Sequence, residues 1–259
     1  MTERIIEKKD GATGWLVFNN PDRRNAVSID MWEAIPQVLE RFAADPEVRV
    51  VVLTGTGDKA FVSGADISQF EKQRSNAEAV QHYEELAEQV QARLQAYDKP
   101  TIARIRGFCL GGGLNIAALC DLRICSDDSR FSIPAAKMGL GYRASSMKNL
   151  VDLVGAPYAR EIMLTARMFS AAEALQMGLV HKVVPVDALD RTIAQYTEMI
   201  GANAPLTMRA AKRIIREVTR ASYDVAQTKA WVKECFDSED YKEGRQAFME
   251  KRKPAFKGR

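Results

Sequence analysis

Short apolar runs typical of β-strands alternate with longer segments of helical period in the first half of the chain. The strand-like runs cover residues 4–9, 15–19, 48–54, 101–105 and 121–125. The run at 48–54 is almost wholly β-branched, so it predicts a strand buried on both faces. Ser28 is a typical N-cap residue, and apolar residues recur every third or fourth position after it. These residues are Met31, Ile35, Leu39 and Phe42. They predict a helix that Pro36 should kink or shorten.

The second half of the chain is predicted to be mainly helical. A polar helix is expected at about residues 77–97, a short apolar helix at 114–120, and helices again from about residue 144 onward. Breaks are expected at Gly155-Ala156-Pro157 and Met177-Gly178. Strand-turn-helix units therefore come first and helices last. This order predicts an α/β fold, with a core over residues 1–200 and a helical C-terminal module over 201–259.

The last three predicted helices, at 206–219, 222–236 and 240–250, carry apolar stripes with no strand left to cover. The stripes are formed by Ile214, Ile215 and Val218, and by Trp231, Val232 and Phe236. Such stripes exceed what a small core needs, so they predict self-association.

Composition narrows the class of protein without identifying it. The 259 residues are 46% hydrophobic and 27% charged, which is typical of a globular protein and excludes disorder. The net charge of +3 is too small to indicate a polyanion-binding surface. No apolar run approaches the ~18 residues of a membrane span, and the N-terminus lacks a secretory pattern. Four cysteines without CxxC pairing and two histidines 99 positions apart predict a cytoplasmic protein with reduced thiols and no metal.

Two glycine-containing turns are the candidate chemistry. Gly111-Gly112-Gly113 precedes an apolar helix, but the lysine and hydroxyl of a phosphate-binding P-loop are missing. The spacing from Gly107 does not fit a dinucleotide fingerprint, and the sequence contains no G-x-S-x-G nucleophile elbow. The triplet therefore predicts free N–H groups at a helix start, or else a tight turn or close helix packing. A second turn follows the strand-like residues 61–62, and two amides from separate segments are what an oxyanion hole requires.

Taken together, the ordered motifs resemble the crotonase (enoyl-CoA hydratase/isomerase) superfamily. The motifs are P-x-x-x-N-A at 21–26, F-x-x-G-A-D-I at 61–67, G-x-x-L-G-G-G at 107–113, C-D-L-R-I at 120–124, F-S-I-P at 131–134 and M-G-L-G at 138–141. The resemblance runs through nearly the whole chain. It implies a spiral of ββα units, capped by C-terminal helices that build a trimer or a dimer of trimers. It also implies an acyl-CoA thioester as substrate, with no separate cofactor because coenzyme A enters as part of that substrate.

The resemblance implies roles for particular residues. The backbone N–H groups of Ala65 and Gly112 would bind the thioester oxygen, where enolate charge develops. Asp66 and Ile67 continue the first turn and join the substrate-binding set. Two further pairs of residues match positions along coenzyme A. Arg24 and Ala26 match the loop beside the CoA arm, and Phe248 and Lys251 match residues near the nucleotide, often supplied by a neighbouring subunit.

This chain departs from the hydratases of the superfamily at both catalytic glutamates. Asn115 and Ala135 stand at those positions, and no acidic residue lies within 110–120 or 129–151. Neither an amide nor a methyl group carries a proton for water addition. Tyr142 matches a tyrosine of the methylmalonyl-CoA decarboxylases, although these carry histidine where this chain has Ala65. Arg143, next to that tyrosine, is a candidate for binding a substrate carboxylate, and Tyr142 as a plain pocket-wall aromatic is the alternative.

Three functional hypotheses follow. The first is a lyase that decarboxylates a malonyl-type acyl-CoA. The second is a hydratase, isomerase or thioesterase that uses another acid, such as Asp66, or a substrate-assisted water. The third is a noncatalytic relative that binds acyl-CoA or RNA, which the basic residues at 251–259 favour. A rim for CoA phosphates explains these charges more simply, so we expect neither nucleic acid nor membrane as a partner.

Overall fold

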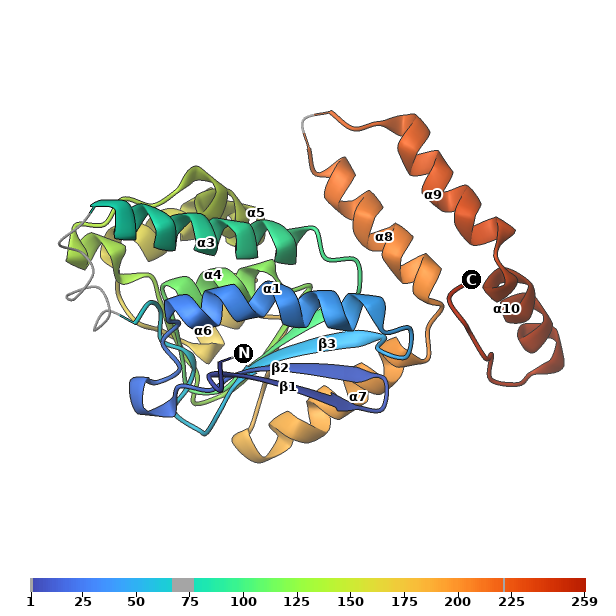
Figure 1. Cartoon of the computed structure of the whole chain (residues 1–259), viewed down its shortest axis with the longest axis horizontal. Helices are drawn as coiled ribbons and strands as arrows, with labels where there is room; N and C mark the ends of the chain where they lie inside the picture. The colour runs from blue at the N-terminus through green and yellow to red at the C-terminus, as the bar shows by residue number, and fades with distance from the viewer. Residues whose placement is uncertain (1, 67–76, 221) are drawn as a thin grey trace.

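Two β-sheets and the helices around them form the body of the protein (Figure 1). The computed structural model describes residues 2–66, 77–220 and 222–259. One sheet has the order β1-β2-β3-β5-β7-β10, formed by β1 (Ile5–Asp10), β2 (Thr13–Phe18), β3 (Val50–Gly55), β5 (Thr101–Ile105), β7 (Leu122–Ser126) and β10 (Lys182–Val184). The other has the order β4-β6-β8-β9, formed by β4 (Ala60–Val62), β6 (Phe108–Leu110), β8 (Arg130–Ser132) and β9 (Phe169–Ser170).

Successive strands alternate between the two sheets, and this alternation makes the fold a spiral. β3, β5 and β7 belong to the larger sheet, whereas β4, β6 and β8 belong to the smaller one. Each ββ pair is followed by a helical segment, first α3 (Ala77–Gln95), then α4 (Gly112–Leu119), then a 3-10 turn, η2 (Pro134–Met138), and α5 (Ala144–Thr165). The α/β architecture with repeated ββα units is therefore confirmed. The spiral places the ends of β4 and β6 side by side, because these two strands are hydrogen-bonded neighbours.

The strand predicted to be buried on both faces is β3, and its residues 50–54 are all buried. Val51 and Leu53 join the core cluster that contains Ile35 of α1 (Ile29–Ala44). Val50 and Val52 face the opposite way, into a second cluster closed by α7 (Leu189–Gly201). Because a strand alternates its side chains between the two faces of a sheet, an apolar run of this kind is stable only between two layers of helix.

Two predicted irregularities have different outcomes. Pro36 lies inside α1, yet the helix continues through it to Ala44, so the prediction of a shortened helix is wrong. Ile35 and Leu39 on either side are fully buried, and this packing holds the turn despite the missing N–H group. The break predicted at 155–157 is confirmed, because Gly155 has a φ of 70° and divides α5 into two helical parts.

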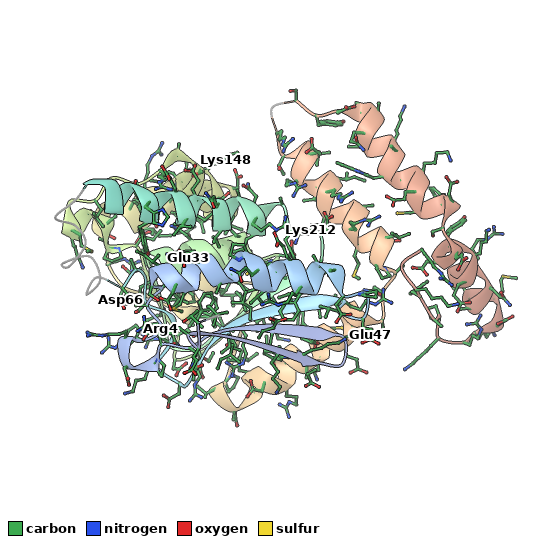
Figure 2. The ribbon with its side chains drawn as sticks, in the orientation of Figure 1. Arg4, Glu33, Glu47, Asp66, Lys148 and Lys212 are labelled. Atoms are coloured by element: carbon green, nitrogen blue, oxygen red, sulfur yellow. The ribbon has the colours of Figure 1, made fainter. Side chains whose placement is uncertain are left out.

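The last three helices extend from one end of the body (Figure 1). They are α8 (Pro205–Val218), α9 (Val225–Asp237) and α10 (Glu239–Glu250). Polar contacts hold α8 against the body. Lys212, which points from α8 toward the body in Figure 2, donates through Nζ to Asp121 Oδ2 at 2.7 Å. Arg213 forms an ion pair with Asp98. The division into a core of residues 1–200 and a module of 201–259 stays a prediction.

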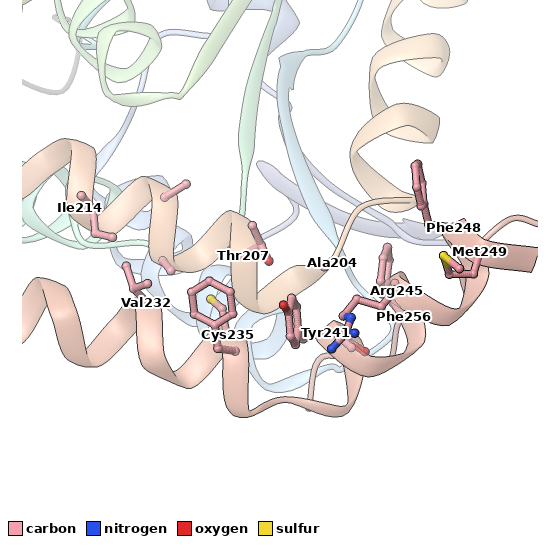
Figure 3. A pocket seen from close by; sticks show the side chains of 15 residues that line it. Ala204, Thr207, Ile214, Val232, Cys235, Tyr241, Arg245, Phe248, Met249 and Phe256 are labelled. Carbon is pink, nitrogen blue, oxygen red and sulfur yellow. The ribbon is translucent and has the colours of Figure 1, made fainter. Parts of the chain in front are cut away.

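The apolar stripes of these helices remain largely uncovered in the single chain. Ile215, Val218, Val232 and Phe236 are exposed, and Phe248 is 83% exposed. A groove of about 850 Å³ runs between α8, α9 and α10, lined by side chains such as Ile214, Val232, Phe236, Tyr241, Phe248 and Met249 (Figure 3). Trp231 differs from the other stripe residues because the Arg213 guanidinium lies 5.7 Å from its ring.

Within the described residues, no helix is both long enough and apolar enough to cross a membrane. The short helix α6 (Ala171–Gln176) completes the body, and it begins with a capping box between Ser170 and Glu173.

Candidate active site

The two glycine turns meet where β4 and β6 end. Gly64 has a φ of 110° and Gly111 a φ of 50°, a left-handed region that favours glycine. A side-chain carbon placed on Gly112 would lie 4.0 Å from the Gly64 Cα, so the backbones of the turns are close neighbours. Sheet pairing between β4 and β6 brings them together, although 47 positions separate Gly64 from Gly111 in the sequence.

Hydrogen bonds to Val27 set the direction of the Ala65 backbone. Val27 N donates to Gly64 O at 2.8 Å, and Asp66 N donates to Val27 O at 3.0 Å. In such a parallel bridge the residue between the two bonded neighbours directs its own N–H to the opposite edge. A side-chain carbon placed on Gly64 would lie 3.5 Å from Leu110 O and 3.9 Å from Gly112 N. The Ala65 amide therefore points away from Val27, in a turn that neighbours the start of α4.

Gly112 is the first residue of α4 and lies at the positive end of that helix. The first intrahelical hydrogen bond runs from Asn115 N to Gly111 O at 3.1 Å, so the N–H groups of residues 112–114 have no acceptor within the helix. The Gly111 amide is occupied, because it donates to Ser132 O at 2.9 Å. Gly112 is thus the first free donor that faces the Gly64 turn.

Gly113 packs closely against β4. A side-chain carbon at this position would lie 2.2 Å from Val62 O, a backbone atom that cannot move independently of β4. The two interpretations of the triplet therefore apply to different residues: close packing explains Gly113, whereas Gly112 borders the candidate site.

Substituting Gly113→Ala should displace α4 from β4 and lower the free energy of unfolding by about 1–3 kcal/mol, the usual cost of overpacking. Urea denaturation followed by circular dichroism measures this loss. Gly201→Ala is the matched control, since Gly201 is also helical and its new methyl group would meet Ala12 Cβ at an ordinary 3.7 Å. Equal stability of the two variants would contradict the packing role of Gly113.

Of the two positions that lack a glutamate, Asn115 lies close to Tyr142. Asn115 is half-buried in the second turn of α4, and helical side chains lean toward the helix N-terminus. Ala135 is buried in η2. The Tyr142 hydroxyl is buried without a hydrogen-bond partner, and burial raises the pKa of Tyr142 to about 12. The Asn115 amide lies near enough to oppose this pKa rise without completing a hydrogen bond in the observed geometry. The site therefore contains an uncharged phenol with unused hydrogen-bonding capacity.

Arg143 does not take the position expected of a group that binds a substrate carboxylate. Its guanidinium forms ion pairs with Glu84 at 3.0 Å and Glu88 at 3.6 Å, both on α3. It also donates to the backbone oxygen of Glu84 at 2.9 Å. These contacts compensate its charge and turn it toward α3, so we do not retain it as a substrate ligand.

The loop at residues 20–26 borders the first turn. Arg24 O accepts from Ser63 N at 3.1 Å, and its guanidinium lies 5.2 Å from the Phe108 ring. Ala26 is buried, and its backbone oxygen accepts from Asn20 Nδ2 at 2.9 Å. Of the other expected residues, Asp66 is buried in the turn itself. Ile67 lies outside the described residues.

Sequence reasoning missed the roles of Asn25 and Lys59 in this region. The Asn25 side chain donates to Ala60 O at 2.7 Å and Thr56 O at 3.0 Å, which joins the loop to the β3–β4 connection. Lys59 lines a cavity of about 540 Å³ together with Arg24. Two features of the sequence could have indicated these roles. Asn25 is the asparagine of the P-x-x-x-N-A motif, and Lys59 lies two positions before Phe61.

Phe248 and Lys251 are not brought to the glycine turns within this chain. Both lie at the C-terminal end of α10, where Lys251 is the C-cap residue. α8 lies between α10 and α4 in Figure 1. No hydrogen bond or ion pair among the described residues joins α10 to Ala65 or Gly112.

Three of the four thiols are buried, and burial raises the pKa of Cys109, Cys120 and Cys125. In the described part of the chain, no cluster of three or more histidine, cysteine or acidic side chains is placed to hold a metal ion.

Comparison with known proteins agrees with this geometry. The family model described as enoyl-CoA hydratase/isomerase matches residues 9–259. A short-chain-enoyl-CoA hydratase from Clostridium acetobutylicum is 37% identical over 259 residues, covering 98% of each chain. A peroxisomal Delta(3,5)-Delta(2,4)-dienoyl-CoA isomerase from Arabidopsis thaliana is 32% identical over 98% of this chain and 96% of that protein. The crystal structure of an enoyl-CoA hydratase/carnithine racemase from Magnetospirillum magneticum, 34% identical, superposes with a TM-score of 0.96 over 100% of this chain and 97% of that one. Together with the spiral and the paired glycine turns, these matches show that the chain belongs to the enoyl-CoA hydratase/isomerase family.

Proposed function

We propose that this enzyme binds an acyl-CoA thioester and stabilises its enolate through the N–H groups of Ala65 and Gly112. The closeness of the two glycine turns supports this proposal, because each turn contributes a backbone amide from a different segment of the chain. Each preorganised donor of this kind contributes about 3–4 kcal/mol to an oxyanion transition state. The relatives named above act on CoA thioesters by their names, which supports the same substrate class here.

The CoA arm would pass the loop at residues 20–26. The cavity that Arg24 shares with Lys59 offers cationic groups for phosphate, and Ser63 joins this loop directly to the Ala65 turn. Phe248 and Lys251 would reach the nucleotide end from a neighbouring subunit. No separate cofactor is needed for this chemistry, since coenzyme A arrives with the acyl group. The cytoplasmic location expected from the sequence stays a prediction.

The reaction that the site supports best is decarboxylation of a malonyl-type acyl-CoA. The bond between the α-carbon and the carboxylate breaks, CO₂ leaves, and the electron pair forms the enolate held by Ala65 and Gly112. This step needs no base, which agrees with Asn115 and Ala135 at the two glutamate positions. The uncharged Tyr142 phenol can orient the carboxylate and then donate a hydrogen bond or a proton at the α-carbon.

One observation favours a second candidate, a hydratase or isomerase. Asp66 is a buried carboxyl group in the same turn as Ala65, and several relatives are named as hydratases. In that case Asp66 would carry the proton that the glutamates carry in the hydratases. A thioesterase, the remaining alternative of this class, would need only an activated water.

A panel of acyl-CoA thioesters, analysed by mass spectrometry, tests these reactions against one another. Loss of the mass of CO₂ from malonyl-type thioesters is the expected result. If 2-enoyl thioesters instead gain the mass of water, the reaction is hydration and not decarboxylation. Release of free CoA would indicate hydrolysis. If binding is measurable and no mass changes, two hypotheses remain: an isomerase, whose product has the same mass as its substrate, and a noncatalytic acyl-CoA-binding protein. Chromatographic separation of the isomers distinguishes them.

We also propose that α8–α10 mediate a homotrimer or a dimer of trimers. The uncovered apolar side chains at the groove of these helices support this assembly (Figure 3). We expect sedimentation velocity at micromolar concentration to show a trimer or hexamer. Phe248→Asp, at an 83% exposed position, should shift the population toward monomers without unfolding the body. A stable wild-type monomer would contradict this proposal and the CoA role of Phe248 and Lys251.

A further inference from the structure

Tyr142 lies on a segment that its own backbone restrains weakly. The last main-chain hydrogen bond of the preceding turn comes from Leu140, and α5 begins only after Arg143. Among the described residues, the N–H groups of residues 141–143 form no main-chain hydrogen bond. Gly139 and Gly141 add conformational freedom, with open space around both. Other groups must therefore determine where the phenol is held.

Arg143 supplies the strongest connection of this segment to another element. One guanidinium contacts two carboxylates and one backbone oxygen of α3, at Glu84 and Glu88. The Arg143 side chain is 32% exposed, whereas the Glu84 and Glu88 side chains are 57% and 64% exposed, so water screens each ion pair and the three contacts restrain Arg143 by acting together. A planar guanidinium that donates in several directions also fixes orientation, which a single ion pair of a flexible lysine does not.

A second contact lies one helical turn further along α5. Ser146 Oγ donates to Gln91 Oε1 at 3.0 Å. Glu84, Glu88 and Gln91 follow the spacing i, i+4, i+7 and therefore share one face of α3. We call these three residues, with Arg143 and Ser146, the α3–α5 polar seam. The adjacent face of α3 carries Ala87 and Val90, which are buried in the core.

The seam and the phenol lie at consecutive positions of the chain. Tyr142 packs against the main core cluster with its hydroxyl buried. Arg143 follows it directly and holds the start of α5 to α3. Release of Arg143 would therefore free the backbone on one side of Tyr142, while the glycines on the other side offer no resistance.

We propose that Arg143 is a positioning residue, which holds the Tyr142 phenol in the active site by clamping the start of α5 to α3 through the polar seam. The consequence for turnover rests on the proposed role of Tyr142, whereas the consequence for phenol burial does not.

Nitration of tyrosine by tetranitromethane measures phenol burial without any substrate. The tryptic peptide that begins at Met138 reports Tyr142 by mass spectrometry, and Tyr223, which is 48% exposed and does not line the groove of α8–α10, serves as an internal standard. We expect little nitration of Tyr142 in the wild type and roughly a tenfold increase in Arg143→Gln, because local opening exposes the ring. The double variant Glu84→Gln/Glu88→Gln should show the same increase, and it guards against misfolding of the first variant.

Lys148→Gln is the matched control. It breaks an exposed ion pair with Asp152 inside α5 and leaves the polar seam intact, so Tyr142 should stay protected. Arg143→Lys should restore part of the protection. Nitration of Tyr142 in Arg143→Gln at the wild-type rate would overturn the proposal.

Kinetics separates this inference from the proposed reaction. With a malonyl-type thioester, Arg143→Gln should lower kcat by ~10-fold with little change in KM, since misplacement of a reacting group affects the chemical step. Normal kcat in a variant whose Tyr142 is exposed would overturn the positioning role. A wild-type enzyme without decarboxylase activity would instead contradict the proposed reaction, and the nitration result would still decide the clamp.

Discussion

Replacing Gly112 by proline is expected to lower kcat with an acyl-CoA substrate by ~10²–10³, equivalent to about 2.7–4 kcal/mol of lost transition-state stabilisation. Proline has no N–H, so this change removes one oxyanion donor. Proline is well tolerated at the first residue of a helix, where Gly112 lies. The variant should therefore keep α4 while losing the donor. Steady-state kinetics with the substrate identified by the acyl-CoA panel measures the effect.

Gly112→Ala is the control for this change, because alanine keeps the backbone N–H. Its methyl group would lie 4.0 Å from Gly64 Cα, an ordinary contact distance. We expect it to retain most of the activity and the full thermal stability. If the proline variant also kept its activity, the Gly112 amide would not bind the thioester oxygen, and the proposed oxyanion hole would fail.

Substituting Tyr142→Phe should lower turnover of a malonyl-type thioester by ~10²-fold or more while leaving substrate affinity nearly unchanged. Phenylalanine keeps the ring that packs on the core and removes only the buried, unpartnered hydroxyl. Isothermal titration with an unreactive acyl-CoA analogue and stopped-flow kinetics separate binding from chemistry.

The pH profile supplies a second test of Tyr142. Burial raises its pKa to about 12, so the phenol remains protonated from neutral pH to about pH 10. Activity should therefore show no alkaline loss from this group until well above the ordinary tyrosine pKa. A hydratase that relies on Asp66 should instead be insensitive to Tyr142→Phe. Unchanged decarboxylation by this variant would remove Tyr142 from the mechanism.

Local patterns predicted the elements of the fold well. The β-branched run of β3 identified a doubly covered strand, because only burial on both faces favours apolar side chains at every position. The apolar period of α1 likewise identified its buried face. The shortening considered at Pro36 did not occur, because tertiary packing holds the helix on both sides of the proline. The alternation of strands between two sheets depends on long-range pairing, and here it followed from the family resemblance.

The sequence shows which residues form the candidate site, but it does not show what each of them does there. Glycine at 64, 111, 112 and 113 is visible in the sequence, but the structure alone shows that Gly113 accommodates Val62 while Gly112 presents a free donor. Both belong to one tripeptide, and their environments differ because helix α4 turns one of them toward β4.

The contacts of charged side chains were even harder to predict from the sequence. Arg143 beside Tyr142 suggested a carboxylate ligand, yet its partners lie 59 and 55 positions earlier, on α3. Long side chains reach whatever the tertiary fold brings near, so sequence adjacency says little about their contacts. The amino-acid order thus established the secondary structure, the family and the loss of both glutamates, which are local or motif properties. Packing between distant segments established the closeness of the two glycine turns, the burial of the Tyr142 hydroxyl and the partners of Arg143, because these depend on which surfaces meet in space.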